Sequence, residues 1–265
     1  MSQTPKVVAI TGASSGIGKE TALLFAKKCW TVYNLSRRPS GLPQVTDISV
    51  DVTDEKAVKT AFDQIQQQSG RLDLLINNAG FGIAGAVEFT ELHEVRRQFD
   101  VNFFGTLNSI KAALPMLKKH RGRIISVSSV AAVFAIPFQS FYSATKASVN
   151  TLTNALANEL KPFGVSVCAL QLGDVKTDFT AARAKSLAGD DVYGGAISHS
   201  VAVMERDEQN GMPAEQIALA IYKIAKKPRV KPLYTIGCKY KLFVFLNKLL
   251  PNALVNSLIR KIYVQ

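Results

Sequence analysis

A short apolar strand runs into a glycine-rich turn in the stretch Val7-Val8-Ala9-Ile10-Thr11-Gly12-Ala13-Ser14-Ser15-Gly16-Ile17-Gly18. Helical spacing of apolar residues follows at once. A glycine-rich turn between a strand and a helix lets backbone amides approach a pyrophosphate, and the helix N-terminus adds favourable partial charge. The G-x-x-x-G-x-G spacing differs from the commoner G-x-G-x-x-G fingerprint. The stretch predicts a dinucleotide site, with a tight turn that needs glycine dihedrals as the alternative.

Outward from this stretch, short β-branched runs alternate with longer segments of helical period, which is typical of a βαβ series. We expect strands near 6–11, 30–35, 46–50, 72–76, 123–128, 164–170 and 232–236. We expect helices near 16–28, 54–68, 90–119, 139–162 and 213–226. The pattern predicts an α/β fold with a doubly wound, seven-stranded parallel sheet and helices on both faces. Ligands of such sheets bind beyond the carboxyl ends of the strands.

The 265 residues are long for an average domain but fit a single α/β domain, 1–265, with an ample core. The cysteines and histidines are scattered without ligand spacing, so we expect neither disulfides nor a metal site: Cys29, Cys168, Cys238, His93, His120 and His199. Neither a secretory signal nor an apolar run of the roughly 18 residues that span a membrane is evident. We therefore expect a soluble, cytoplasmic protein.

The end of the second expected strand, Leu35-Ser36-Arg37-Arg38, suits a phosphorylated cofactor. An NAD site would place an acidic residue near Ser36 to bind the ribose hydroxyls, whereas two arginines favour a 2′-phosphate. The sequence predicts NADP(H) over NAD(H), with Arg37 as the better candidate and Arg38 beside it. Arginines that merely solvate a loop are the alternative.

Two further strands end at the edge of the sheet where the cofactor is expected to bind. Asp51-Val52 follows the third strand, and Asn77-Asn78-Ala79-Gly80 follows the fourth. We expect Asp51 to bond an adenine amino group, or else to cap the next helix together with Asp54. Asn78 and Gly80 would allow close backbone approach to the cofactor.

Tyr142-Ser-Ala-Thr-Lys146 can place a phenol and an ammonium one helical turn apart on one face. The charge of Lys146 would then lower the pKa of Tyr142, and such a tyrosine can exchange a proton with an alcohol or carbonyl. By itself the pair also fits a solvated helix face.

Together these motifs resemble the short-chain dehydrogenase/reductase family over about residues 5–180. The matching elements are T-G-x-x-x-G-x-G at 11–18, N-N-A-G at 77–80, Asn102, Ser129 and Y-x-x-x-K at 142–146. The resemblance implies a Rossmann-like domain, a nicotinamide cofactor and a catalytic tetrad of Asn102, Ser129, Tyr142 and Lys146. The cofactor contacts that we expect are Gly12, Ser14, Ser15, Gly16, Ile17, Gly18, Arg37, Arg38, Asp51, Val52, Asn78, Ala79, Gly80, Tyr142, Lys146, Val175 and Thr177.

The resemblance also implies roles. Tyr142 would be the general acid for a carbonyl oxygen, or the base in the reverse direction, and Ser129 would hydrogen-bond the same oxygen. Lys146 would bind the nicotinamide ribose, and Asn102 would hold a water that links Lys146 to solvent. The alternatives are a helix-kink residue for Asn102, a strand-end serine for Ser129 and a solvated charge for Lys146.

The segment 173–213, here called the lid segment, interrupts the βαβ rhythm, and we expect a functional lid with short helices or a variable surface insertion. Where similar proteins carry Pro-Gly, this chain has Leu172-Gly173, which puts the stiffness of the loop in question. An apolar lining would suit a hydrophobic alcohol or ketone. Its expected members are Phe81, Ile83, Val130, Ala131, Val133, Phe134, Ile136, Phe138 and Phe179.

The net charge of +12 is concentrated near the end of the chain. After Glu215 no acid occurs, while ten basic residues do: Lys223, Lys226, Lys227, Arg229, Lys231, Lys239, Lys241, Lys248, Arg260 and Lys261. Residues 239–265, the C-terminal extension, have helical spacing over 239–250 and 252–264. The extension suits a helix on anionic lipid, or equally one packed on the protein body or on a partner subunit. The extension matches no known nucleic-acid-binding motif, so we expect no nucleic-acid partner.

These observations predict an NADP(H)-dependent oxidoreductase that interconverts a lipophilic ketone or aldehyde and its alcohol. The alternatives are a 3-oxoacyl thioester reductase of fatty-acid type and a non-catalytic NADP(H)-binding sensor. The helices at 90–119 and 139–162 resemble those that pair subunits in the family, so we expect a homodimer or homotetramer.

Overall fold

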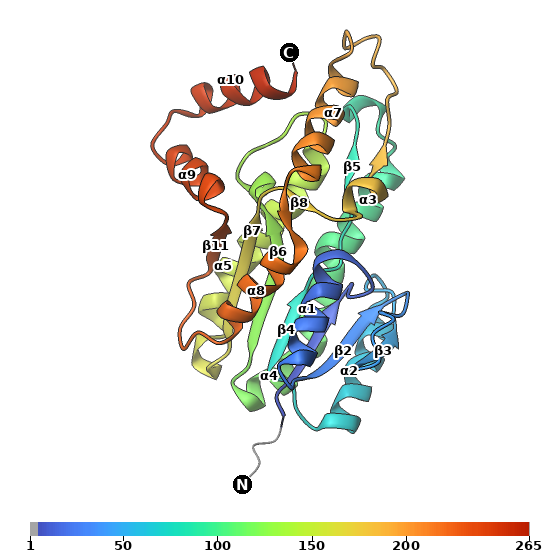
Figure 1. Cartoon of the computed structure of the whole chain (residues 1–265), viewed down its shortest axis with the longest axis vertical. Coiled ribbons are helices and arrows are strands. Elements are labelled where there is room, and N and C mark those ends of the chain that lie inside the picture. Colours follow the sequence, from blue (N-terminus) through green and yellow to red (C-terminus); the bar gives the residue numbers. More distant parts are fainter. Residues whose placement is uncertain (1–4, 265) are drawn as a thin grey trace.

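The computed structural model describes residues 5–264, so residues 1–4 and 265, the last of the C-terminal extension, lie outside the described residues. Its centre is a seven-stranded sheet in the order β11-β7-β6-β4-β1-β2-β3, and every pairing in it is parallel (Figure 1). The strands are β1 (Val7–Thr11), β2 (Thr31–Ser36), β3 (Val45–Ser49), β4 (Leu74–Asn77), β6 (Arg123–Ser129), β7 (Ser166–Leu172) and β11 (Leu233–Ile236). This confirms the predicted doubly wound, Rossmann-like sheet.

Helices cover both faces of the sheet. The regular ones are α1 (Gly16–Lys27), α2 (Glu55–Ser69), α3 (Leu92–Phe99), α4 (Gly105–His120), α5 (Ser140–Glu159) and α8 (Ala214–Ala225). One core cluster joins α2, α4 and α5 to the sheet, with Phe62 and Leu117 buried in it. The other joins α1 and α8, where Phe25 and Ile221 are fully buried. Two separate apolar layers explain why the strands read as nearly continuous apolar runs.

Capping residues determine where helix α2 begins and ends. Asp54 accepts hydrogen bonds from the backbone N–H groups of Lys56 and Ala57 and so begins α2. Gly70 ends the same helix in the left-handed conformation, with φ of 65°. Along the β6–β7 pair, Ser129 lies opposite Leu172, so the end of β6 lies beside the start of the lid segment.

The helix expected at 90–119 is interrupted. A π-helical turn, η2 (Asp100–Phe104), separates α3 from α4. Apolar spacing alone does not reveal such a turn, because the turn is defined by backbone hydrogen bonds of the i→i+5 kind. Shorter 3-10 turns occur at η1 (Val87–Phe89), η3 (Val130–Ala132) and η4 (Lys161–Phe163).

Beyond the carboxyl ends of the strands lie the lid segment and the C-terminal extension (Figure 1). The lid segment contains β8 (Val175–Lys176), α6 (Phe179–Ala182), β9 (Ala184–Lys185), α7 (Ala196–Gln209) and β10 (Met212–Pro213). β8 pairs with β10, and β9 pairs with β5 (Ile83–Ala84). The expectation of short helices there holds for α6, while α7 is a regular helix of 14 residues.

The C-terminal extension forms α9 (Cys238–Asn247) and α10 (Asn252–Tyr263), with the break at Pro251. α10 packs against α7, and α9 packs beside β11. Within residues 5–264, no helix combines the length and the apolar character that a membrane span requires.

Candidate active site

The glycine-rich turn packs against the end of β4 with no room for side chains. A Cβ at Gly12, where φ is 69°, would lie 2.9 Å from the Cα of Ala79. A Cβ at Gly18 would lie 2.5 Å from Nδ2 of Asn78. The turn therefore needs glycine for close approach as well as for its dihedral angle.

Hydrogen bonds from Asn78 hold the glycine-rich turn in place. Its Nδ2 donates to the carbonyl oxygens of Thr11 at 3.2 Å and Gly12 at 3.0 Å. Thr11 Oγ1 accepts in return from the backbone N–H groups of Asn78 and Ala79, both at 3.0 Å. Asn78 thus positions the turn, whose backbone could then approach a pyrophosphate as the sequence predicts.

The loops after β2 and β3 form the end of the crevice where the sequence predicts the adenosine of a cofactor. The Arg37 side chain is 69% exposed, and its Nη1 lies 3.8 Å from Oδ2 of Asp51. Asp51 also accepts from the N–H and hydroxyl of Thr53. Burial opposes ionisation of Asp51, but the Thr53 hydrogen bonds and the charges of Arg37 and Arg97 outweigh it and lower its pKa.

The structure gives the two aspartates different roles, so the alternative that both cap the helix holds for Asp54 only. Asp54 caps α2, while Asp51 closes the preceding turn and lines the crevice. Arg97 on α3 also lines the crevice, with its guanidinium 5.1 Å from the centre of the Phe81 ring. Sequence reasoning missed Arg97 because an arginine on an amphipathic helix gives no signal beyond a solvated face.

Tyr142 and Lys146 lie one turn apart on α5, and Ser129 ends β6. Lys146 Nζ donates to the carbonyl oxygen of Val127 at 2.9 Å and lies 5.6 Å from the centre of the Tyr142 ring. Ser129 Oγ accepts from the N–H of Ala131 at 3.1 Å. Ser128 points elsewhere, since it is buried and donates to the Lys146 carbonyl.

Burial sets the protonation of the pair. It raises the pKa of Tyr142 to about 12, although the Ser129 hydroxyl and the Arg183 charge oppose the rise. It lowers the pKa of Lys146 to about 8. The expectation that Lys146 depresses the pKa of Tyr142 is therefore wrong for this structure, because the cost of burying a phenolate dominates. At neutral pH, Tyr142 is a neutral phenol and Lys146 carries its charge.

Asn102 is buried in the π-turn η2. Its Oδ1 accepts from the N–H of Phe81, and its Nδ2 donates to the Phe81 carbonyl and to Thr145 Oγ1, all at 3.0 to 3.1 Å. A Cβ at Gly80 would lie 3.1 Å from this Oδ1 and 3.6 Å from Lys146 Nζ. Asn102 thus links the loop after β4 to α5 at the point where the helix is distorted.

One cavity of about 1200 Å³ unites these residues. Of the expected catalytic residues Ser129, Tyr142 and Lys146 line it and Asn102 does not, and of the expected cofactor contacts all but Gly18 line it. The residues fit a dinucleotide, because the glycine cradle, the arginines and the strand-end carboxylate follow one another along the crevice. Within residues 5–264, no cluster of His, Cys, Asp and Glu could hold a metal ion.

The substrate end of the cavity differs in part from expectation. Phe81, Val130, Ala131, Ile136 and Phe179 line it as expected. The remaining four do not: Ile83, Val133, Phe134 and Phe138. Ile83 and Phe138 are buried in packing contacts, and Val133 lines a second hollow of about 680 Å³ beside β11 and α9. Side-chain direction in a loop cannot be read from residue type, which explains the error.

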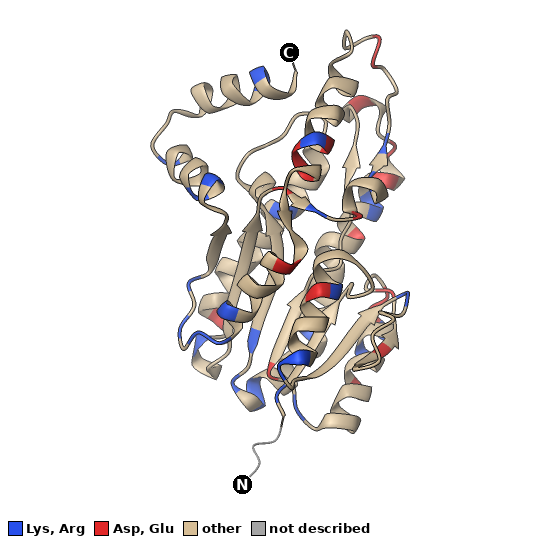
Figure 2. Cartoon of the chain, viewed as in Figure 1, with Lys and Arg blue, Asp and Glu red and all other residues tan. Residues whose placement is uncertain are grey.

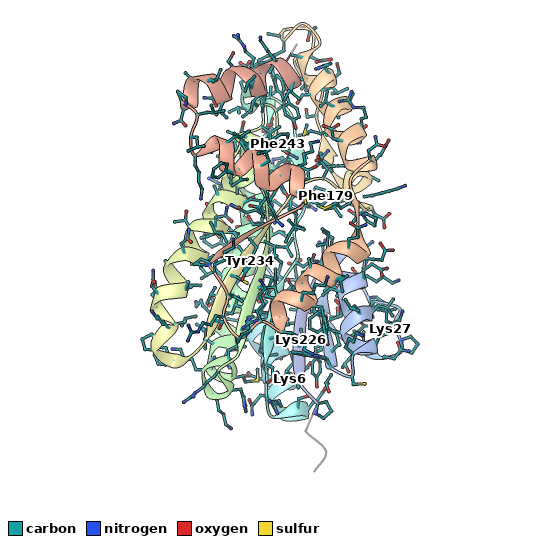
Figure 3. The ribbon with its side chains drawn as sticks, turned by 60° about the vertical axis from the view of Figure 1, so that its left-hand side comes forward. Lys6, Lys27, Phe179, Lys226, Tyr234 and Phe243 are labelled. Atoms are coloured by element: carbon teal, nitrogen blue, oxygen red, sulfur yellow. The ribbon has the colours of Figure 1, made fainter. Side chains whose placement is uncertain are left out.

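The lid segment supplies wall residues that the sequence did not single out: Asp174, Asp178, Ala181, Ala182, Met204 and Glu208. Tyr263 of α10 joins them. Figure 3 shows Phe179 at the upper end of the sheet, where the lid segment begins. Its ring lies 5.9 Å from that of Tyr142. Val175 and Thr177 line the cavity as expected, and Thr177 closely approaches Gly16.

The C-terminal extension is fixed to the base of the lid segment. The Tyr240 hydroxyl donates to Oδ2 of Asp174 at 2.5 Å and accepts from the Asp174 N–H at 3.0 Å. The ring lies so close to Gly173 that no Cβ would fit there. Tyr240 therefore occupies the space that a larger residue at 173 would need.

Comparison with known proteins agrees with this geometry. The family profile described as short chain dehydrogenase matches residues 6–188. A 3-ketodihydrosphingosine reductase of Bacteroides thetaiotaomicron is 40% identical over 269 residues, which cover 98% of each chain. A short-chain dehydrogenase from Streptomyces avermitilis has a similar structure, with a TM-score of 0.83, 27% identity and 97% of each chain covered.

Another short-chain dehydrogenase, from Burkholderia cenocepacia, was solved in complex with NADP. It matches with a TM-score of 0.77 and 25% identity, over 96% of this chain and 97% of that one. The sheet order, the glycine-rich turn and these similarities lead to one conclusion. The chain belongs to the short-chain dehydrogenase/reductase family of oxidoreductases.

Proposed function

We propose that this protein is an NADP(H)-dependent reductase of a lipophilic ketone. The observation that carries the proposal is the single cavity in which Tyr142, Ser129 and Lys146 meet the glycine cradle at one end and an apolar wall at the other. The nicotinamide cofactor, when bound, supplies the hydride. The protein's part is to hold the ketone against it and to deliver a proton to its oxygen.

Tyr142 is the proposed proton donor. With a pKa near 12 it is protonated at neutral pH, which suits donation to a carbonyl and therefore the direction of reduction. Ser129 would hydrogen-bond the same oxygen as negative charge develops on it. The Lys146 charge would stabilise the phenolate left behind, and Asn102 would act as a positioning residue between the loop after β4 and α5.

Arg37 and Arg38 support a preference for NADP(H). Both line the cavity at the end of β2. The position before them, where an NAD site would carry an acidic residue, is occupied by Ser36. The weak 3.8 Å contact between Arg37 and Asp51 leaves the exposed guanidinium free to turn toward a 2′-phosphate. The NADP-bound relative from Burkholderia cenocepacia supports the same choice.

The apolar wall and the similarity to a 3-ketodihydrosphingosine reductase support a long-chain ketone of that kind as the substrate. Phe81, Ile136, Phe179 and Met204 offer a surface on which an aliphatic chain can pack. A 3-oxoacyl thioester and a sensor role without turnover remain as the competing outcomes of the test below.

The C-terminal extension is proposed to contact an anionic lipid surface. On α9 and just after it, Leu242, Phe245 and Leu249 are 54%, 58% and 65% exposed. On α10, exposed Leu254, Leu258 and Ile262 recur every four residues and so form one stripe. Figure 2 shows lysines and arginines on these two helices and no acidic residue. Exposed apolar bulk beside unopposed positive charge matches a lipid surface better than the protein body.

The remaining assignments are also proposals. We propose one functional domain over 1–265, with the lid segment over the substrate and with α4 and α5 pairing subunits in a homodimer or homotetramer. A reducing, cytoplasmic compartment fits three free cysteines at 29, 168 and 238. Light scattering of the purified protein would give the oligomeric state.

The test of function is a matched pair of assays. NADPH and NADH binding is measured by fluorescence titration, and NADPH consumption is then followed with long-chain ketones, 3-oxoacyl thioesters and small ketones. The proposal predicts tighter binding of NADPH and the highest kcat/KM for long-chain ketones. Turnover confined to the thioesters would establish the fatty-acid alternative, and tight NADPH binding without turnover would establish the sensor.

A further inference from the structure

A buried ion pair lies within the lid segment. Arg183, which follows α6, pairs through Nη2 with Oε1 of Glu208 on α7. The Arg183 side chain is 0% exposed and that of Glu208 is 14% exposed. Glu208 Oε2 also accepts from Thr180 Oγ1 at 2.6 Å. Burying two charges has a large desolvation cost, so a packed apolar pair would stabilise the lid as well or better.

This pair is adjacent to the reacting group. Glu208 lines the same cavity as Tyr142. The guanidinium of Arg183 lies 5.6 Å from the centre of the Phe179 ring, which itself lies 5.9 Å from that of Tyr142. Both charges act on the phenol: Arg183 lowers the pKa of Tyr142, and Glu208 raises it. A substrate carbonyl held by Tyr142 would therefore share its cavity with the Glu208 carboxylate.

The pair has hydrogen-bonding capacity left over. A carboxylate offers about four acceptor positions, and the contacts with Arg183 and Thr180 use two on Glu208. Within residues 5–264, Nε and Nη1 of Arg183 are buried donors without a hydrogen-bond partner, but Arg183 is not among the residues that line the cavity. The group of the pair that can accept from a substrate is therefore Glu208. The same wall carries the apolar side chains of Phe179, Ala182 and Met204 as well as the carboxylates of Asp174 and Asp178. A substrate made purely of hydrocarbon around its ketone would leave the open acceptor positions of the Glu208 carboxylate without a donor.

We propose that Glu208, held in place by Arg183, forms a polar subsite for a hydrogen-bond donor, an ammonium or hydroxyl, on the carbon next to the ketone. The enzyme would then select long-chain amino or hydroxy ketones over plain ketones. The inference rests on the proposed function, because it assumes that Tyr142 holds the ketone oxygen. The carboxylate favours an ammonium most, since a charge-assisted hydrogen bond is stronger than a neutral one.

The test compares three 3-ketones of equal chain length, which carry an amino group, a hydroxyl group or hydrogen at carbon 2. Wild-type kcat/KM should exceed that for the plain ketone by about tenfold for the amino ketone, with the hydroxy ketone between them. Glu208→Gln should bring the ratio of amino to plain ketone close to one. A variant ratio equal to the wild-type ratio, whatever the overall loss of rate, would overturn the proposal, because a purely structural defect lowers both rates together.

Two further variants keep the test decisive. Glu205→Gln, one turn earlier on α7, breaks the contact of Glu205 with Lys185, a pair that does not line the cavity, and should leave the ratio unchanged. If Glu208→Gln does not fold, Arg183→Met combined with Glu208→Met removes both charges at once and should also abolish the preference.

Equilibrium binding separates this inference from the proposed function. The matching 2-amino alcohol and plain alcohol are titrated into the NADP-loaded protein by calorimetry, which requires no turnover. Wild-type protein should bind the amino alcohol about tenfold more tightly, and Glu208→Gln should lose that difference. Equal affinities in the wild type would refute the subsite alone. Absence of any ketone reduction, with the affinity difference intact, would refute the proposed function alone.

Discussion

Tyr142 and Lys146 occupy a buried environment that moves their pKa values in opposite directions, upward to about 12 and downward to about 8. Both shifts bring the two groups closer to their neutral forms. At neutral pH the pair is therefore a protonated phenol beside a cation. In the proposed mechanism, the bound substrate oxygen and cofactor must help to stabilise the phenolate, because Lys146 alone does not.

The first prediction concerns Lys146 and stability. Between pH 8 and 10.5 the unfolded chain binds the lysine proton while the folded chain has released it, so stability from this group rises with pH. The difference in Tm between wild type and Lys146→Met should therefore shift in favour of the wild type from pH 7 to about 9.5. Differential scanning fluorimetry measures it. The range stops short of pH 10, where titration of Tyr142 begins to act in the opposite sense. A pH-independent difference would mean that the pKa of Lys146 is unshifted.

The second prediction concerns Arg37. Replacement by Asp removes the proposed partner of the 2′-phosphate and adds a like charge beside Asp51, so NADPH affinity should fall about tenfold or more while NADH affinity does not fall. Fluorescence titration with both cofactors gives the ratio. Lys27→Asp, an exposed change at the end of α1, is the matched control. An unchanged ratio of NADPH to NADH affinity would indicate that Arg38 or Lys19 binds the 2′-phosphate instead.

At the scale of elements, the junction of β1, α1 and β4 is the most constrained part of the fold. Gly18→Ala should destabilise the protein by about 2 kcal/mol or more and weaken NADPH binding, because its Cβ would meet Asn78 Nδ2 at 2.5 Å. Denaturant unfolding measures the first effect. Gly194→Ala is the control, since its φ is 59° but its Cβ would meet nothing within 4 Å. It should cost about 1 kcal/mol from its dihedral angle alone and spare cofactor affinity. Equal losses in both would contradict the packing argument.

The elements that the sequence predicted are those with strong local patterns. The runs that became β1, β4 and β7 are buried on both faces, so each reads as a near-continuous apolar segment. The turn and strand ends carry polar residues at spacings that only a parallel sheet brings together. The π-turn at 100–104 and the packing of α7 depend on contacts between distant segments, such as Asn102 with Phe81, which no local pattern encodes.

At the scale of the whole molecule, the C-terminal extension meets the pocket at two points. Tyr240 holds Asp174 at the base of the lid segment, and Tyr263 lines the cavity itself. The sequence showed the charge and apolar content of this segment but left open whether it contacts lipid, the body or a partner. The structure shows that one side packs on the body while Leu249 and Phe245 remain exposed.

The prediction for this surface is lipid binding. Wild-type protein should float with vesicles that contain phosphatidylserine, less so with neutral vesicles or at high salt. Phe245→Glu with Leu249→Glu should abolish flotation, and Val192→Glu, at an exposed position of the lid segment, should not. If the double variant instead turns a dimer into a monomer and no vesicle ever binds, the surface is a subunit interface.

The candidate site was also only partly visible in the sequence. Asn102, Ser129, Tyr142 and Lys146 stood out through the family pattern; Ser129, Tyr142 and Lys146 line one cavity, and Asn102 is buried and hydrogen-bonded to Phe81 and Thr145. Arg97, Met204, Glu208 and Tyr263 did not, because they come from helices whose orientation over the cavity is set by tertiary packing.

The proposed role of Tyr142 is to donate the proton that accompanies reduction of a ketone. The most direct measurement is NADPH consumption by Tyr142→Phe with a long-chain ketone, together with an NADPH titration of the same protein. If Tyr142 is the proton donor, kcat should fall by at least about a hundredfold while NADPH affinity stays within a few-fold. Turnover of the variant at a rate close to that of the wild type would contradict it.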